Sequence, residues 1–267
     1  MYSMTHTSTP IILKNGFSLI EMAIVLFIVA LLLGGLLPTV SSQIEQQRRS
    51  ETRKQLDEIQ QALIGFAFAN GRLPCPADRT IVSGQANAGL EVTTGTGATL
   101  TCSAAIVTNN AAWGVLPWAT LGVNETDAWG RRFTYRVTLH FADAIELETN
   151  TSGCTLVTLP VSPLFASFAL CSNGNVTVRT AATGGTNVAS TIPAVIVSHG
   201  TNGLGAYTPA GLQVTPVPAT TSDEGENVYT TNLIFVSHDI TPTFDDMVVW
   251  ITPNILFNRM VSAGKLP

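Results

Sequence analysis

One uninterrupted apolar segment near the N-terminus most constrains how this chain can fold. Residues 17–37 read FSLIEMAIVLFIVALLLGGLL and carry a single charge, at Glu21. A helix that crosses a membrane needs about 20 such residues, and residues 23–37 are apolar on every side, which is not the pattern of a helix on a protein surface. An ordinary secretory signal would be cut behind the apolar region, where only a weak site is found at 40–42. The pattern therefore predicts a retained membrane-spanning helix.

The charges of the chain are unevenly distributed. The 267 residues include 18 acidic and 13 basic residues, for a net charge of −5. No run of Lys and Arg is present, so we expect no nucleic-acid partner. The charges are dense between residues 41 and 79 and sparse from residue 80 onward. We expect the following parts: a leader at 1–16, the transmembrane half of a long helix at 17–40, its amphipathic half at 41–71, and a β-rich globular domain at 72–267.

The amphipathic half is predicted from its hydrophobic spacing. Apolar residues recur near helical intervals among charged and amide residues, at Ile44, Leu56, Ile59, Leu63 and Phe66. Gly71 and Pro74 follow and are typical stop signals. We expect the apolar stripe of this half to pack on the globular domain.

Strand signals recur after the helix. They lie at 133–141, 167–171, 176–180, 194–198, 233–238 and 247–252. The dipeptide Asn173-Gly174 predicts a hairpin between the second and third of them. Because strands do not alternate with helices, we expect an α+β fold in which an antiparallel sheet packs on the long helix, with a short final helix around 253–264.

The chain has four cysteines, which are Cys75, Cys102, Cys154 and Cys171. They form no C-x-x-C pair and accompany no histidine pair at zinc spacing, so metal and thioredoxin-like roles are disfavoured. An even number favours two disulfides in an oxidising periplasm. Three pairings are possible, and we favour Cys75–Cys102 and Cys154–Cys171 because each joins neighbours in the sequence.

The residues before the apolar segment carry a family resemblance. Lys14-Asn15-Gly16 stands directly before Phe17-Ser18-Leu19-Ile20-Glu21, which resembles the leader of the type IV prepilin family, including type IV pilins, minor pilins and type II secretion pseudopilins. The resemblance covers about the first 60 residues. It implies that a prepilin peptidase cuts after Gly16 and that the new N-terminus, Phe17, is methylated. The implied partners are this peptidase, other pilin or pseudopilin subunits, an inner-membrane assembly platform and the lipid bilayer.

The resemblance gives Glu21 a role in assembly. A carboxylate in hydrocarbon costs about 2.5–3.5 kcal/mol on insertion scales, and the amine that cleavage creates at Phe17 is a natural partner at the same depth. In the family, this Glu of an incoming subunit meets the terminal amine of its neighbour. The alternative is that Glu21 reaches the headgroups from the helix start.

The implied location is the inner membrane with a single pass and a periplasmic C-terminal domain, followed by an extracellular fibre or a periplasmic pseudopilus. The positive-inside rule opposes this orientation, because basic residues favour the cytoplasmic side of a span. Here Lys14 alone precedes the span, and four basic residues follow it, which are Arg48, Arg49, Arg53 and Lys54. The leader motif and the cysteines favour the periplasm.

Two further patterns bear on the globular domain. Residues 127–130, Asp-Ala-Trp-Gly, look like the D-x-W-G turn of pseudopilins, and we expect a structural turn. Asp223, Glu224 and Glu226, with Asp245-Asp246 elsewhere, supply oxygen atoms of the kind calcium prefers, and major pseudopilins bind calcium. Because their spacing matches no EF-hand, a solvated acidic loop is the favoured interpretation, and we assign no metal residue and no cofactor.

The favoured function is therefore a structural subunit without catalytic residues, minor rather than major because the mature chain is long. One alternative is a membrane-anchored extracytoplasmic binding or adhesion module. Another is a tethered hydrolase built on Ser198-His199 and His238-Asp239. The hydrolase is disfavoured because the chain has no G-x-S-x-G turn.

Overall fold

The structure is a computed structural model that describes residues 16, 18–144, 166–228 and 232–266, without the side chains of 33–40, 98 and 104. The chain divides into two compact units, Met1–Gln46 and Gln47–Pro267. Its helices and strands follow in this order: α1 Leu19–Asn70, β1 Thr93–Thr94, β2 Thr101–Cys102, β3 Val107–Thr108, β4 Ala111–Val115, α2 Trp118–Leu121, β5 Thr134–Thr138, β6 Val176–Arg179, β7 Asn187–Ile192, β8 Ala194–Ser198, α3 Asp223–Val228, β9 Ile234–Val236, β10 Met247–Ile251 and α4 Pro253–Ser262.

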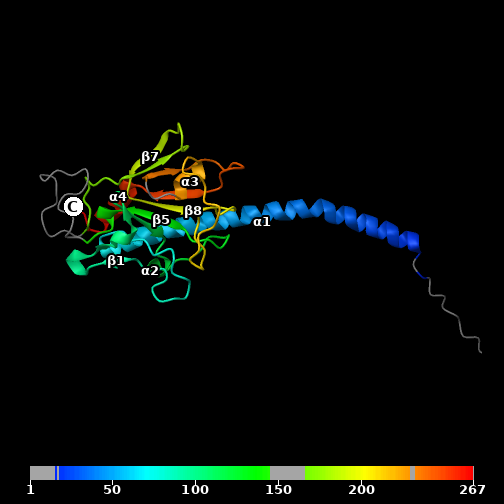
Figure 1. Cartoon of the computed structure of the whole chain (residues 1–267), viewed down its shortest axis with the longest axis horizontal. Coiled ribbons are helices and arrows are strands. Elements are labelled where there is room, and N and C mark those ends of the chain that lie inside the picture. The colour runs from blue at the N-terminus through cyan, green and yellow to red at the C-terminus, as the bar shows by residue number, and fades with distance from the viewer. Residues whose placement is uncertain (1–15, 17, 145–165, 229–231, 267) are drawn as a thin grey trace, which may run out of the picture. The chain divides into compact units, whose positions relative to one another are not determined.

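Helix α1 begins in the first unit and ends in the second (Figure 1). Its last residue is followed by Gly71 with a φ of 71°, whose amide donates to the carbonyl of Ala67 at 2.8 Å, the arrangement expected where a helix stops at glycine. Within the part of the chain that the structure describes, no helix combines the length and the apolar character that a membrane crossing requires.

The second unit is built in layers (Figure 1). A five-stranded sheet has the order β10-β8-β5-β4-β3, with every neighbouring pair antiparallel. One face shares a hydrophobic core with α1, because Leu56, Ile59, Leu63 and Ala67 are at most 1% exposed and cluster with residues of the sheet. This confirms the α+β fold with a long helix packed on an antiparallel sheet.

The opposite face of the five-stranded sheet packs on a second sheet. Side chains of a strand alternate between its faces, so Val195 and Val197 of β8 point away from α1 and cluster with β6, β7 and β9. These three strands form a sheet of order β7-β6-β9. The pair β6–β9 is parallel, a pairing that the sequence did not predict.

The predicted strands agree with the structure at β6, β8, β9 and β10, and the final helix is confirmed as α4. The prediction was wrong at 167–171, where the chain forms bends and turns. There the Ser167 amide donates to the Gly71 carbonyl at the end of α1, and the Ala169 amide donates to Ser172 Oγ, so these groups do not pair with a strand. Asn173-Gly174 therefore does not close a hairpin.

Other differences follow from packing. The predicted strand at 133–141 ends at Thr138 and continues as a 3₁₀ turn, Leu139–Phe141. Strand β4 was missed because its sequence, AAWGV, contains a single β-branched residue. In α1, Ile44 was expected in the apolar stripe but is exposed, and Phe66 is half-buried while Ala67 is buried.

The disulfide Cys75–Cys102 is present, as predicted. It joins the chain just after α1 to β2, and both residues are buried. The second predicted bridge includes Cys154, which lies outside the described residues, so that pairing stays a prediction.

Candidate functional site

The N-terminal motif residues lie at the start of α1. Gly16 and Glu21 are exposed, and Phe17 lies outside the described residues. The amide of Ser18 donates to Glu21 Oε2 at 2.9 Å, and the amide of Ile20 donates to Ser18 Oγ at 3.3 Å. The bond from the Ser18 amide to Glu21 is the glutamate half of a capping box, which the S-x-x-E spacing could have predicted and the sequence analysis missed, while Ser18 Oγ caps the amide two residues on. Glu21 therefore accepts a hydrogen bond at the first turn of the helix.

The Asp127 turn has the structural role that was predicted. Asp127 Oδ1 accepts from the amides of Trp129 and Arg131, both at 3.0 Å, and Gly130 has a φ of 79°. Trp129 packs against the main core. Burial raises the pKa of Asp127, although these hydrogen bonds oppose the shift. The turn is thus fixed to the domain by a buried carboxyl.

Three neighbouring strands bring distant polar residues together at one end of the five-stranded sheet. Asp246 directly precedes β10, His199 directly follows β8, and Thr134 begins β5. Because Met247 pairs with Ser198 and Val197 pairs with Thr134, the three side chains belong to adjacent strand ends. The strand order thus creates a polar centre that no local pattern predicts.

The buried imidazole of His199 lies between the other two residues. Its Nε2 is 2.8 Å from Thr134 Oγ1, and its Nδ1 is 3.6 Å from Asp246 Oδ1. The other oxygen of Asp246, Oδ2, accepts from Asn227 Nδ2 at 2.8 Å. Both His199 and Asp246 are almost completely buried.

Asp246 also belongs to a group of three carboxylates. Glu224, Asp245 and Asp246 each place one oxygen within 4.8 Å of the others. Glu224 Oε1 accepts from Asn202 Nδ2 at 2.6 Å, and Asp245 Oδ2 accepts from the Asn202 amide at 2.9 Å. Gly200, with a φ of 56°, lets its loop approach, because a Cβ there would collide with the carbonyl and carboxyl of Asp245.

This carboxylate group suits a cation. The described residues give no hydrogen bond to the buried Oδ1 atoms of Asp245 and Asp246, although His199 Nδ1 lies 3.6 Å from the latter. Burial, together with the negative charges of the neighbouring carboxylates, raises the pKa values of Glu224 and Asp245. Hard divalent cations such as calcium take several carboxylate oxygens as ligands, so Glu224, Asp245 and Asp246 are placed to hold one.

The acidic residues that the sequence grouped together are separated in the structure. Residues Asp223–Val228 form helix α3 and not a solvated loop. Of its acids, only Glu224 joins Asp245 and Asp246; Asp223 Oδ2 lies 3.1 Å from His238 Nε2, and Glu226 accepts from Asn232. The reason is that a helix points successive side chains in different directions.

The residues suggested for a hydrolase are also separated. Ser198 Oγ donates to Asp127 Oδ2 at 2.7 Å, while His199 contacts Thr134 and Asp246. His238 Nδ1 lies 2.7 Å from the carbonyl of Asp239 and its Nε2 faces Asp223. The structure therefore does not assemble Ser198, a histidine and Asp239 into a triad.

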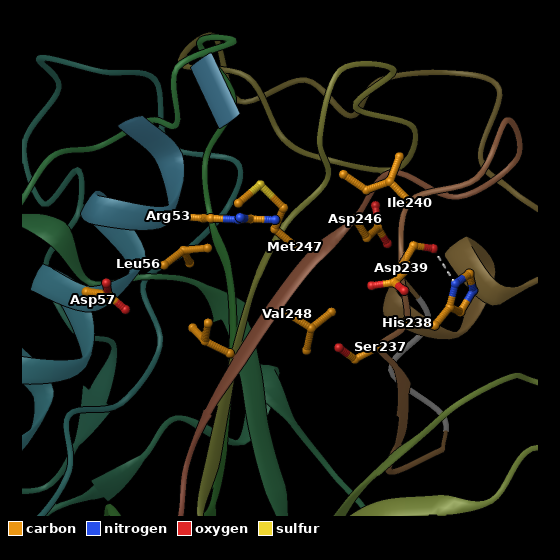
Figure 2. Close-up of a pocket in the computed structure, with 11 residues that line it drawn as sticks. Arg53, Leu56, Asp57, Ser237, His238, Asp239, Ile240, Asp246, Met247 and Val248 are labelled. Atoms are coloured by element: carbon orange, nitrogen blue, oxygen red, sulfur yellow. Dashed lines mark hydrogen bonds between the residues drawn. The ribbon is translucent and has the colours of Figure 1, made fainter. Parts of the chain in front are cut away.

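A cavity of about 370 Å³ adjoins Asp246. It lies between α1, the start of β10 and residues 237–240. Figure 2 shows Arg53 extending from α1 toward Met247, with Asp246, Asp239 and His238 on the opposite side. The amphipathic half of α1, with Arg53 and Asp57, thus forms one wall of a recess whose other wall carries Asp239 and Asp246.

Comparison with known proteins finds one family. The model of the prokaryotic N-terminal methylation motif matches residues 13–37. No curated protein and no solved structure matches the chain. The match includes Gly16, Phe17 and Glu21, the residues on which the resemblance was based. The chain therefore carries an N-terminal methylation motif, and in this motif it is similar to type IV prepilins.

Proposed function

We propose that this protein is a structural subunit of a pilus or pseudopilus. A prepilin peptidase cleaves it after Gly16, Phe17 is methylated, and the apolar segment 17–37 holds the mature chain in the inner membrane with the globular unit in the periplasm. The observation that carries this proposal is the methylation motif at 13–37, which extends into the 52-residue helix α1. A minor position in the fibre is proposed from the length of the chain.

In this proposal Glu21 changes partners during assembly. Its carboxylate accepts from the Ser18 amide at the first turn of α1. Cleavage creates a positively charged amine at Phe17, which attracts the carboxylate of a neighbouring subunit more strongly in the membrane than in water. The partners are thus the peptidase, the inner-membrane assembly platform and other subunits.

The processing test uses the full chain co-expressed with a prepilin peptidase. Intact mass and N-terminal sequencing of the membrane-extracted protein are expected to give a chain that starts at methylated Phe17. Gly16→Val is expected to block cleavage, whereas Glu21→Gln is expected to be cleaved but to lose incorporation into fibres. A chain that keeps Met1, or one cut after the apolar segment, would contradict the proposal.

A second candidate function, cation binding in the globular unit, is favoured by the buried Oδ1 atoms of Asp245 and Asp246, to which the described residues give no hydrogen bond. A cation bound only to the folded state stabilises it by about 2.7 kcal/mol at 100 times its Kd. Calcium is therefore expected to raise the melting temperature of the full chain by several degrees, and a chelator to reverse the rise.

The variant Asp246→Asn separates cation binding from simple packing. It removes one of three mutually repelling charges, so without calcium its melting temperature is expected to equal or exceed that of the wild type, while its response to calcium is lost. The exposed change Glu58→Gln, on α1, is the control and is expected to leave the response intact. A full calcium response in Asp246→Asn would exclude this site.

A further inference from the structure

A second cavity, of about 350 Å³, lies apart from the carboxylate group. Its lining comes from several segments that are distant in the sequence, and it includes Arg79, Trp113, Thr134, Tyr207 and Gln213. At the ~30 Å³ that one water occupies in the liquid, this volume suits a ligand of about a dozen non-hydrogen atoms. It falls in the lower part of the size range of small-molecule sites.

Arg79 gives this cavity a fixed positive charge. Its guanidinium carbon lies 3.8 Å from the ring centre of Trp113 and 5.5 Å from that of Tyr207, and its Nε donates to the Tyr207 hydroxyl at 2.8 Å. Contacts between a guanidinium and aromatic faces hold the cation in place without neutralising it. The two rings and the Tyr207 hydroxyl thus hold the guanidinium of Arg79 at the cavity wall.

The charge of Arg79 is not balanced by a carboxylate in the described part of the chain. By contrast, the buried Arg72 and Arg132 pair with Glu91 and Glu125 at 2.7 and 2.9 Å. Among the described residues, neither Nη1 nor Nη2 of Arg79 has a hydrogen-bond partner. A guanidinium with two free nitrogens matches the geometry of a carboxylate.

Other groups in the cavity are arranged to recognise hydroxyls. The Tyr207 hydroxyl accepts from Arg79, so its own hydrogen is available to donate to a ligand. Gln213 Nε2 donates to the Gly205 carbonyl at 3.0 Å, which leaves its Oε1 as an acceptor. Donors therefore gather at Arg79 and Tyr207, and an acceptor lies at Gln213.

Thr134 offers a second acceptor in the cavity wall. Its Oγ1 lies 2.8 Å from Nε2 of the buried His199, so one hydrogen-bonding position of the hydroxyl is used there. A hydroxyl has one donor hydrogen and two lone pairs, so whichever of them Thr134 uses toward His199, at least one lone pair is left for another donor.

We propose that this cavity binds a small hydroxy-carboxylic acid of the size of a sugar acid. Its carboxylate lies on the terminal nitrogens of Arg79 and on the Tyr207 hydroxyl, and its hydroxyls donate to Gln213 Oε1 and Thr134 Oγ1. An acidic side chain of a partner protein has the carboxylate but no hydroxyls to satisfy these acceptors. This binding is independent of fibre assembly.

The test is a titration of the full mature chain in detergent with D-glucuronate, followed by saturation-transfer NMR and by tryptophan fluorescence, to which Trp113 beside Arg79 is expected to contribute. Glucose lacks the carboxylate and acetate lacks the hydroxyls, and both are expected to bind at least about tenfold more weakly, which corresponds to about 1.4 kcal/mol. A peptide rich in glutamate tests the protein-partner alternative.

Arg79→Gln is expected to weaken glucuronate binding by tenfold or more, and Gln213→Glu to weaken it by charge repulsion. Arg179→Gln, at an arginine of β6 bonded to Asn187, is the control and is expected to bind as the wild type does. Thermal unfolding checks that each variant is folded. If Arg79→Gln does not fold, Arg79→Lys, which keeps the charge and loses the paired nitrogens, takes its place.

Three results would overturn the proposal. The first is the absence of glucuronate binding to the wild type at about 10 mM, a concentration that detects even weak sites. The second is unchanged binding in both the Arg79 and Gln213 variants. The third is equal binding of acetate, or binding of the acidic peptide alone, which would assign the cavity to a bare carboxylate.

Discussion

Ser198 Oγ donates a 2.7 Å hydrogen bond to Oδ2 of Asp127, and both side chains are buried. The bond joins the end of β8 to the turn that leads into β5. The other oxygen of Asp127 accepts from two backbone amides of that turn. One buried carboxyl therefore fixes the turn and connects it to the sheet.

Removing this carboxyl is expected to cost more stability than removing the hydroxyl that faces it. Asp127→Ala leaves two amides and one hydroxyl without an acceptor, and each unsatisfied buried group costs about 1–3 kcal/mol. Ser198→Ala keeps both amide bonds to Oδ1 and leaves only Oδ2 without its donor, so it is expected to cost about 1 kcal/mol. Denaturant unfolding of both variants and of the double variant measures the coupling. Strictly additive effects would contradict the direct bond.

His140 is expected to make the protein sensitive to mild acid. The side chain is 2% exposed, and burial lowers its pKa from 6.5 to about 4. Because the folded state disfavours the charged ring, the unfolded chain takes up the proton more readily. Stability that is present above pH 6.5 is thus lost progressively as the pH falls toward 4, by up to about 3 kcal/mol.

The measurement is the free energy of unfolding at several pH values for the wild type and for His140→Gln, which cannot titrate. The decrease between pH 7 and pH 4 is expected to be smaller in the variant. Parallel pH profiles for the two proteins would show that His140 is not the sensitive group.

The disulfide Cys75–Cys102 is expected to contribute stability through the unfolded chain. It closes a loop with a sequence separation of 27, for which loss of chain entropy corresponds to about 3–4 kcal/mol. The double variant Cys75→Ala, Cys102→Ala is expected to unfold at a correspondingly lower denaturant concentration. The comparison is made without reductant, so that the remaining cysteines keep their state. An unchanged midpoint would argue against the loop-closure account.

The apolar stripe of α1 is expected to stabilise the protein through Leu63 and not through Ile44. Leu63 is fully buried in the core shared with the sheet, so Leu63→Ala is expected to cost about 2–5 kcal/mol. Ile44 is 46% exposed, and Ile44→Ala is expected to change the free energy of unfolding by less than about 0.5 kcal/mol. Thermal unfolding of the detergent-solubilised chain measures both. Similar losses of stability at the two positions would contradict the packing of α1 through Leu63.

The sequence predicted those elements whose cause is local. The end of α1 depends on Gly71, the start of the final helix on Pro253 in its first turn, and strand β8 on a continuous apolar run, and all three agree with the structure. Strand β4 depends on its place between two other strands, and its own residues give only a weak signal. The segment 167–171 was predicted as a strand and is not one, because the amides of Ser167 and Ala169 bond to the end of α1 and to a serine side chain.

The acidic residues show why the site was harder to predict than the fold. Asp223, Glu224 and Glu226 are neighbours in the sequence, but α3 directs them to different partners. Glu224 meets Asp245 and Asp246 across about twenty residues of chain. The sequence shows which acidic residues a cation could use, but it does not show which of them come together in the fold.

The sequence alone was thus enough to predict the prepilin-like leader motif, the apolar segment behind it and the helix that follows, because each depends on short-range spacing. Only the tertiary structure decided that His199 contacts Thr134 and Asp246, and that the guanidinium of Arg79 lies against Trp113 and Tyr207, with no ion pair to a carboxylate of the described residues. These contacts join residues up to 128 positions apart. They depend on the order and register of the strands, which long-range packing selects and which no local pattern of side chains specifies.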